Sequence, residues 1–534
     1  MRIQRKQQLL LAVIVIGTLT PFLNRAFHVD EPLFIWMAQQ IAKHPLDPYG
    51  FELNWSSFIQ AMSAVMQNPP LCSYYMAAVA GVFGWTEPAL HFAFLIWAIM
   101  SILGTFALAR RFCQKPLIAG LLTLFTPVFL VSATNVMCDV MMLALWIWGL
   151  ESWLAGLDRQ RSWPFLVSAA LTSAAALTKY FGMSLVPLLA VYTLARERKF
   201  TLKLAYLLVP IAIASNYDFM TEAKYGHGLF SASMTASASI SSATRPSLFI
   251  QLLIGLAFGG GCFISALFFA PFGRKRPLLA GAIGFIAFAA AFKFAIVSWI
   301  YLETSEAPVW LEGGLFAIVG VGILALASIS LIQKRNADAL LFALWILGTF
   351  CFATFFNWSV TARTFLPMAP PVAILVIQQF ERIEIRRWVR CLPLLGAAGL
   401  SILIAVADYQ QANCGRAAAR FYQERYGAEP GKVRFLGHWG FQYYMQQWGA
   451  KAFDRTNPKV TQGDIIVGPF SDSNVTQVSV EKVLAREESA FTTLPFLSTS
   501  ALGTGAGFYS SFGGPLPWAI NKIPPERYFA VQTH

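Results

Sequence analysis

The sequence predicts a mainly α-helical, polytopic membrane protein of about 13 transmembrane helices, followed by a small α/β extramembrane domain at the C-terminus. Hydrophobic residues make up 56% of the 534-residue chain even when its 38 glycines are left out, whereas soluble domains reach ~45–50% with glycine counted. Charged residues make up only 13%, about half of the usual share. Lys and Arg stand in short groups between long apolar runs, as they do in loops between membrane spans. A chain with so little polar surface fits a bilayer rather than water.

The first apolar run begins close to the N-terminus. Arg2, Arg5 and Lys6 precede the run Leu9–Leu23, and this charge pattern occurs both in signal peptides and in first membrane spans. The run lacks a small-x-small cleavage site, and further apolar runs follow it. We therefore expect an uncleaved first transmembrane helix.

Stretches of about twenty apolar residues mark candidate spans along the rest of the chain. One candidate is short, and the one at 365–380 is interrupted by three prolines. The thirteen candidates lie at 8–27, 89–109, 116–134, 136–156, 164–181, 183–195, 203–220, 248–271, 277–300, 311–333, 338–357, 365–380 and 391–408.

The distribution of cations predicts the orientation of these spans. With a cytoplasmic N-terminus, the inner segments hold 21 Lys and Arg residues and the outer loops before the tail hold six, in agreement with the positive-inside rule. Thirteen spans then place the C-terminus on the non-cytoplasmic side of the cell inner (plasma) membrane. Because the cations do not form one stripe, the net charge of +13 does not indicate nucleic-acid binding. The six outer cations are Arg25, Lys43, Lys179, Lys224, Arg245 and Arg363.

Two domains follow from this pattern, a transmembrane domain over 1–409 and an extracytoplasmic domain over 410–534. The first outer loop, 28–88, carries amphipathic stretches that suit helices lying in the membrane interface. The second, 221–247, is rich in Ser, Ala and Thr and predicts a mobile loop. The tail shows short β-like runs such as Lys432–Leu436 and Asp464–Val467 between Gly/Pro turns, which predicts a compact α/β module.

Ionisable residues near the membrane are functional candidates because they are costly there. Asp30 and Glu31 form an adjacent pair of carboxylates just after the first span. Such a pair can act as a base and its orienting partner, or as metal ligands. A second interpretation is that Asp30 only caps the helix that begins near Pro32. Both roles are compatible with one side chain.

The other candidates also lie at the outer ends of predicted spans. Asp139 opens the fourth span, Lys179-Tyr180 closes the fifth, and Arg363 precedes the twelfth. Each has a simpler interpretation, as a helix cap or as a cation that extends to the interface. Carboxylates and cations together at headgroup level are what a reaction on a lipid phosphate needs, because the cations hold the phosphate while a carboxylate activates a hydroxyl.

The order of these motifs resembles that of the C-class (GT-C) membrane glycosyltransferases, most of all the branch of protein O-mannosyltransferases and lipid A aminoarabinose transferases. The resemblance covers roughly residues 1–380. The motifs that carry it are Asp30-Glu31, Pro69-Pro70-Leu71 with Tyr74, Phe83-Gly84, Asp139, Thr178-Lys179-Tyr180, and Arg363 ahead of Leu366-Pro367.

The resemblance implies a polyprenyl-phosphate sugar as donor and a hydroxyl of a lipid, glycan or protein as acceptor. It makes Asp30 the general base, with Glu31 and Asp139 in support, and it places Lys179 and Arg363 at the lipid phosphate. Tyr74 and Tyr180 belong to the same substrate-binding motifs. Many relatives have Lys before the double proline, where this chain has Asn68, and that departure puts the contacts to the donor headgroup in doubt.

No cofactor is expected, and a divalent metal is not favoured. A monophosphate leaving group can be held by Lys and Arg alone, whereas pyrophosphate donors more often call for a divalent cation. His227, the only histidine in its loop, is a poor metal site by itself.

Three functions are compatible with these features. The first is an inverting glycosyltransferase that uses a lipid-phosphate sugar. The second is a transporter or flippase of a lipid-linked saccharide, although transporters keep their charges near the bilayer midplane and Lys293 is the only clear cation in the middle of a predicted span. The third is a non-catalytic member of an envelope-glycan assembly complex. In the tail, Trp439 and Trp448 suit either core packing or stacking on an acceptor sugar.

Overall fold

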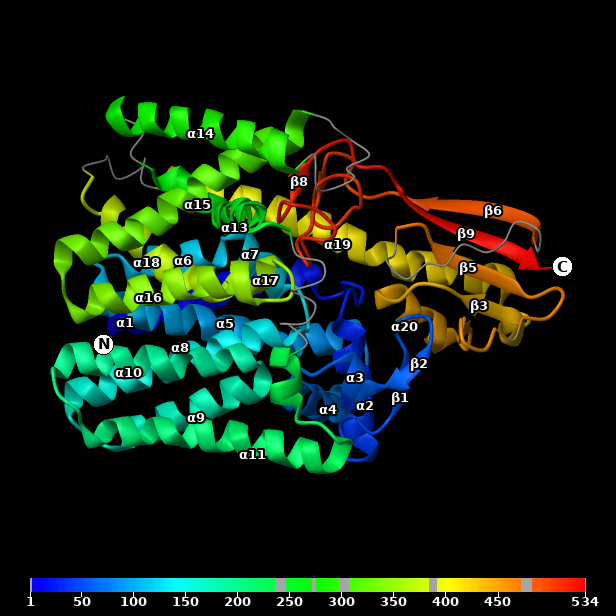
Figure 1. Cartoon of the computed structure of the whole chain (residues 1–534), viewed down its shortest axis with the longest axis horizontal. Helices are drawn as coiled ribbons and strands as arrows, with labels where there is room; N and C mark the ends of the chain where they lie inside the picture. Colours follow the sequence, from blue (N-terminus) through cyan, green and yellow to red (C-terminus); the bar gives the residue numbers. More distant parts are fainter. Residues whose placement is uncertain are drawn as a thin grey trace.

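The computed structural model describes residues 2–235, 246–270, 275–296, 307–383, 391–458, 460–471 and 483–533. An elongated bundle of helices occupies most of the molecule, and a small β-sheet lies beyond one end of it (Figure 1). A single long helix, α19, runs from the bundle into the sheet region (Figure 1). The molecule is therefore mainly helical with a small C-terminal sheet, as the sequence predicts.

A helix lies at each of the thirteen predicted spans. The bundle is made of α1 (Arg2–Leu19), α5 (Glu87–Phe112), α6 (Pro116–Leu124), α7 (Pro127–Ala133), α8 (Cys138–Arg159), α9 (Trp163–Thr178), α10 (Leu185–Glu197), α11 (Leu208–Tyr225), α13 (Leu248–Cys262), α14 (Lys275–Ile296), α15 (Ala307–Lys334), α16 (Ala337–Cys351), α17 (Ala362–Phe365), α18 (Ala369–Phe380) and α19 (Leu392–Tyr426). The last residues of the ninth predicted span, 297–300, lie outside the described residues.

The expected count of thirteen spans is not confirmed. Within the described residues, seven helices are long and apolar enough to cross a membrane, or up to eight if one bent pair forms a single span. That pair is α6 and α7, which meet at 65° where Pro127 opens the second helix and has no N–H to continue the first. Other helices of the bundle, such as α9 with 16 residues and α13 with 15, are shorter than the roughly 20 residues that a membrane span needs.

The first outer loop is compact and lies at the end of the bundle that faces the sheet (Figure 1). Within it α2 packs closely against α4. That these helices lie in the membrane interface stays a prediction. Its elements are α2 (Glu31–Lys43), β1 (Glu52–Asn54), β2 (Ile59–Ala61), α3 (Met62–Val65) and α4 (Leu71–Phe83), with β1 and β2 antiparallel.

The second outer loop begins as helix rather than as coil. Helix α11 continues to Tyr225, and residues 229–235 are again helical. Asp218 fixes the start of this second helical segment, because its Oδ1 accepts hydrogen bonds from the N–H groups of Phe230 and Ser231 at 2.9 and 3.1 Å. Residues 236–245 of the predicted mobile loop lie outside the described residues.

The C-terminal sheet has the strand order β4-β3-β5-β9-β6. Strands β3 and β5 fall on the two β-like runs of the sequence, which confirms that prediction. Helix α20 (Trp439–Trp448) and the end of α19 contribute to the core on one face of the sheet, with Phe441 and Tyr422 among its buried residues. The strands are β3 (Val433–Phe435), β4 (Lys451–Ala452), β5 (Ile465–Pro469), β6 (Val483–Phe491) and β9 (Glu526–Thr533), with β3 parallel to β4 and β5, and β9 antiparallel to β5 and β6.

The tail is connected to the bundle by a continuous helix and by a segment that returns to it. Helix α19 passes without a break through the predicted domain boundary at 409/410. The segment around the antiparallel pair β7 (Leu497–Ser498) and β8 (Ala519–Ile520) returns to the bundle. There the Phe508 carbonyl accepts the N–H of Ala362 at 2.8 Å, and Trp518 Nε1 donates to the Gly261 carbonyl at 2.9 Å.

Candidate active site

Four of the predicted site residues meet at the end of the bundle that faces the sheet. Arg363 Nη2 donates to Asp30 Oδ2 at 2.8 Å, and Arg363 Nη1 lies 3.8 Å from Asp139 Oδ2. Lys179 Nζ donates to Asp139 Oδ1 at 2.5 Å. We call this chain of alternating charges the Asp30 cluster.

Each member is placed by the end of a different element. Asp30 is the residue before α2, Asp139 lies in the first turn of α8, and Lys179 follows the last residue of α9 in an extended conformation. Arg363 sits in the short helix α17, whose first turn is closed by Thr361 accepting from the Thr364 N–H. Helix ends at one level of a bundle bring together residues that are far apart in sequence.

Asp30 does not use its side chain as a helix cap. It occupies the N-cap position of α2, but its carboxylate makes no capping hydrogen bond and instead receives the guanidinium of Arg363. The side chain of Asp30 is 35% exposed, that of Asp139 only 3%. Asp30 is therefore the carboxylate of the cluster that a molecule from outside can reach.

The Asp30 cluster keeps unused capacity for a ligand. Its two cations and two carboxylates sum to zero charge. Among the described residues, Arg363 Nε and Asp139 Oδ2 make no hydrogen bond although both are buried. Arg363 Nη1 also lies 2.6 Å from Met137 Sδ, and its guanidinium lies 5.4 Å from the ring centroid of Tyr509. Buried polar atoms without partners are costly. An anion could accept a hydrogen bond from Arg363 Nε, and a hydroxyl could donate one to Asp139 Oδ2.

Glu31 lies in a different environment from its neighbour. Its side chain is fully buried, and it accepts hydrogen bonds from Arg25 Nη1 at 2.9 Å, from the His28 N–H at 2.6 Å and from the Val136 N–H at 2.7 Å. Burial raises the pKa of the Glu31 carboxyl above its usual value, against the opposing effects of Arg25 and the two amides. Glu31 thus ties the loop before α2 to the segment just before α8, and it is enclosed by protein.

Arg25 is the centre of a second group of charges that the sequence did not mark as a site. Its guanidinium donates to Asp408 Oδ2 at 3.0 and 3.2 Å and to the Tyr509 hydroxyl at 3.1 Å. The Tyr509 hydroxyl donates in turn to Asp408 Oδ1 at 2.9 Å. We call Arg25, Glu31, Asp408 and Tyr509 the Arg25 cluster. Asp408 gave a usable signal, because it is a carboxylate at the end of a predicted span, whereas nothing in the sequence marked Tyr509.

Tyr74 and Tyr180 lie outside the Asp30 cluster. The Tyr74 hydroxyl donates to the Pro45 carbonyl at 2.5 Å, and the Tyr180 ring packs on Phe230 with centroids 5.0 Å apart. Tyr49 lies in the same first outer loop, where its hydroxyl donates to the carbonyl of Asn68 at 2.5 Å. Of these aromatic residues, Tyr180 is the one that adjoins the Asp30 cluster in the chain, because it directly follows Lys179.

The tail holds the loop that carries Asp30. The Tyr444 hydroxyl of α20 accepts the N–H of Phe27 at 2.9 Å. Gly440 packs so closely that a Cβ atom would lie 2.0 Å from the Phe27 carbonyl oxygen, so a glycine is needed there. Trp439 packs against His28 with ring centroids 6.2 Å apart, while Trp448 borders the core between α20 and the sheet. Sugar stacking on either ring stays a prediction.

Within the described parts of the chain, no group of three or more His, Cys, Asp and Glu side chains is placed to hold a metal ion. The carboxylates of the Asp30 cluster each face a cation rather than each other. The chemistry available at the cluster itself is proton transfer by a carboxylate and charge compensation by Arg and Lys.

Comparison with protein families gives one match in the chain. Residues 67–216 match the family described as dolichyl-phosphate-mannose-protein mannosyltransferase. The segment contains Tyr74, Asp139, Lys179 and Tyr180 and leaves out Asp30 and Arg363. The match confirms the resemblance to GT-C membrane glycosyltransferases that the sequence motifs indicate. Comparison with curated proteins finds no match.

Among solved structures, 19 chains match. ArnT from Cupriavidus metallidurans bound to undecaprenyl phosphate is 16% identical over 86% of this chain and 93% of its own, with a TM-score of 0.45. The Archaeoglobus fulgidus oligosaccharyltransferase tethered with an acceptor peptide is 12% identical over 83% of this chain and 63% of its own, with a TM-score of 0.46. These likenesses are too distant to assign a role to any residue of this chain.

Proposed function

We propose that this protein is a glycosyltransferase that moves a sugar from a polyprenyl-phosphate donor to a hydroxyl acceptor on the non-cytoplasmic face of the membrane. The acceptor is a lipid, a glycan or a protein. The observation that carries the proposal is the Asp30 cluster, in which an accessible carboxylate lies in contact with a cation at one end of the spans. The match of residues 67–216 supports the same class of reaction.

Asp30 is the general base in this proposal. As the acceptor oxygen forms its bond to the anomeric carbon, the bond from that carbon to the phosphate oxygen breaks. The acceptor proton passes to Asp30, and the donor leaves as polyprenyl monophosphate. One displacement of this kind inverts the anomeric centre. A carboxylate within hydrogen-bond reach of the acceptor hydroxyl is suited to take its proton.

Arg363 and Lys179 bind the donor phosphate in this proposal. Both are already paired, Arg363 with Asp30 and Lys179 with Asp139. A phosphate that takes over Arg363 would release Asp30, so donor binding would both hold the leaving group and free the base. Charge-assisted bonds from Arg to phosphate are strong enough to compete with a partly exposed carboxylate pair.

The remaining predicted residues have supporting roles. Glu31 orients the loop that carries Asp30, and Asp139 positions the two cations. Tyr74 and Tyr180 border the substrate site. No metal is assigned a role, because two cations offset the charge of a departing monophosphate. Transfer that continues undiminished in a chelator would agree with this assignment, and transfer that returns only with added Mg²⁺ or Mn²⁺ would contradict it.

We also propose that the chain lies in the cell inner (plasma) membrane with a cytoplasmic N-terminus and a non-cytoplasmic C-terminus. The excess of cations at the end of the bundle opposite the Asp30 cluster supports this orientation. A reporter that is active only in the cytoplasm should stay silent when fused at His534. A strong signal would mean that the C-terminus is cytoplasmic, and the Asp30 cluster would then have to be assigned to the cytoplasmic side of the membrane.

The decisive experiment combines a strain that lacks the protein with assays of the purified enzyme. Mass spectrometry of envelope glycans and lipids should show one sugar substituent missing from the deletion strain and restored by the wild-type gene. The purified protein should then consume the matching polyprenyl-phosphate sugar and release polyprenyl phosphate. A normal glycan profile, or accumulation of unused donor on the cytoplasmic leaflet only, would favour the assembly or flippase function instead.

A further inference from the structure

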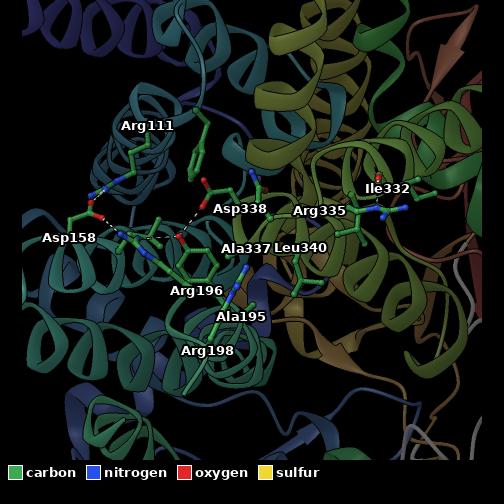
Figure 2. A pocket seen from close by; sticks show the side chains of 15 residues that line it. Arg111, Asp158, Ala195, Arg196, Arg198, Ile332, Arg335, Ala337, Asp338 and Leu340 are labelled. Atoms are coloured by element: carbon green, nitrogen blue, oxygen red, sulfur yellow. Dashed lines mark hydrogen bonds and ion pairs between the residues drawn. The ribbon is translucent and has the colours of Figure 1, made fainter. Parts of the chain in front are cut away.

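A large cavity lies at the end of the bundle opposite the Asp30 cluster. Its volume is about 1010 Å³, and it opens between the ends of α5, α8, α10 and α15 and the start of α16. Figure 2 shows charged side chains around it, and none of them belongs to the proposed catalytic machinery. Its charged lining consists of Arg111, Asp158, Arg196, Arg198, Arg335 and Asp338.

One wall of the cavity is a continuous polar network. Arg111 pairs with both oxygens of Glu151 at 2.7 Å and also with Asp158. Asp158 accepts from Arg196 at 2.6 Å (Figure 2), and Arg196 donates to the Tyr192 hydroxyl at 3.3 Å. The Tyr192 hydroxyl donates in turn to Asp338 Oδ1 of α16 at 2.9 Å. The wall therefore joins four helices, and its charged groups are paired with one another, so it supplies a rigid frame rather than a free charge.

The two remaining arginines are not neutralised. Among the described residues, neither Arg198 nor Arg335 forms an ion pair, and the only hydrogen bond of the Arg335 side chain is from Nε to the Ile332 carbonyl at 3.3 Å. Both are exposed. Four arginines therefore face Asp158, Asp338 and the neighbouring Glu151, which leaves one excess positive charge at the cavity. A phosphodiester carries one negative charge and would balance it.

Apart from Tyr192 and Asn336, the other lining residues are apolar, among them Leu154, Leu331 and Ile332. Ile332 is 65% exposed at the end of a helix apolar enough to span a membrane. Basic pockets between spans at headgroup level are suited to anionic lipids. We propose that this cavity binds a phosphate ester, with Arg198 and Arg335 as its ligands. A lipid headgroup is the source that the apolar walls favour, and a soluble phosphate ester is the other source of the same chemistry.

The test uses the purified, delipidated full-length chain and native mass spectrometry. Phosphatidylglycerol, phosphatidylcholine and glycerol 3-phosphate are added separately. The wild-type chain should retain phosphatidylglycerol in preference to the zwitterionic phosphatidylcholine. Arg198→Gln and Arg335→Gln should each lower its retention roughly 5-fold. The matched control is Arg161→Gln, an exposed arginine at the same end of the bundle that does not line the cavity.

The outcomes separate the sources and can overturn the proposal. Displacement of phosphatidylglycerol by glycerol 3-phosphate would identify a soluble ester, and its failure to displace would identify a lipid. Equal retention of phosphatidylglycerol by the variant that carries both Arg198→Gln and Arg335→Gln and by the Arg161→Gln control would refute the site. Equal retention of the two lipids by the wild-type chain would also refute it. If the glutamine variants melt early, Arg198→Lys with Arg335→Lys keeps the charge and should restore binding.

Discussion

Asp30 and Glu31 are neighbours in the sequence but belong to different ion clusters. Asp30 is 35% exposed and holds Arg363, whereas Glu31 is fully buried and holds Arg25. Consecutive side chains at the start of a helix diverge by about 100°, and here one turns toward the outside while the next turns into the protein. Two carboxylates adjacent in sequence can therefore divide into one group that a substrate can reach and one that is enclosed by protein.

The largest expected effect is on catalysis through the Asp30 cluster. Asp30→Asn keeps the size of the side chain and removes its basicity, so kcat for sugar transfer should fall about 10²–10⁴-fold while the fold survives. Transfer assays at saturating donor measure this loss, and Glu31→Gln should cost much less. If Glu31→Gln abolishes transfer while Asp30→Asn stays near wild type, the two roles are exchanged. If neither matters, Asp139→Asn is the next variant.

The next effect is on stability through the Arg25 cluster. Arg25→Met leaves the buried carboxylates of Glu31 and Asp408 without their cation, which should lower the free energy of unfolding by about 3–5 kcal/mol. Thermal unfolding in detergent measures the change. The matched control is Arg363→Met in the accessible cluster, which should lose less stability because water reaches Asp30. Equal losses of unfolding free energy in the two variants would show that the Arg25 cluster contributes no more to stability than the Asp30 cluster.

A smaller effect concerns the donor. Lys179→Ala and Arg363→Ala should each raise the donor KM, since a charge-assisted contact to phosphate contributes about 1.5–3 kcal/mol. Lys224→Ala is the control, because Lys224 is an outer cation that pairs with Asp47 at 3.1 Å instead. Donor titrations with normal protein levels decide the question. If both site variants keep the wild-type donor KM, these cations do not bind the donor and serve only as membrane anchors.

The smallest effect concerns Tyr509, which belongs to the Arg25 cluster and also contacts Arg363 of the Asp30 cluster. Tyr509 donates to Asp408 through its hydroxyl and faces Arg363 with its ring. Tyr509→Phe removes only the hydroxyl, so it should cost about 1 kcal/mol of stability and leave the donor KM unchanged. Tyr509→Leu removes the ring as well and should also raise the donor KM. A KM change in the phenylalanine variant would show that the clusters act as one.

Much of the fold follows from the sequence because apolar runs of helical length are a strong signal. The number of spans does not follow, since the Pro127 bend and helices as short as α13 depend on packing. Asp30, Asp139, Lys179 and Arg363 meet as expected, because each lies at or next to the end of a predicted span on the same predicted face.

The environment of individual side chains was harder to predict. The burial of Glu31 depends on Arg25 and on the Val136 N–H, and neither contact leaves a local pattern. Tyr509 stands in an irregular segment with no periodicity, and its partner Arg25 is 484 positions away. A predicted boundary at 409/410 followed from a change in composition, yet α19 is continuous there because its second half also has a buried face, which includes Ala418 and Tyr422 and packs in the core beside the sheet.

The return of the tail to the bundle has a consequence for biosynthesis. Arg25 emerges early from the ribosome, but Tyr509 and Thr499, which complete the partners of Asp408, are made near the end of translation. Until they are made, the end of the bundle that faces the sheet carries a charged centre that is only partly enclosed. Chains that stop short of Tyr509 would present that open centre to the quality-control proteases of the membrane, and a premature stop late in the gene would act as a loss of the whole protein.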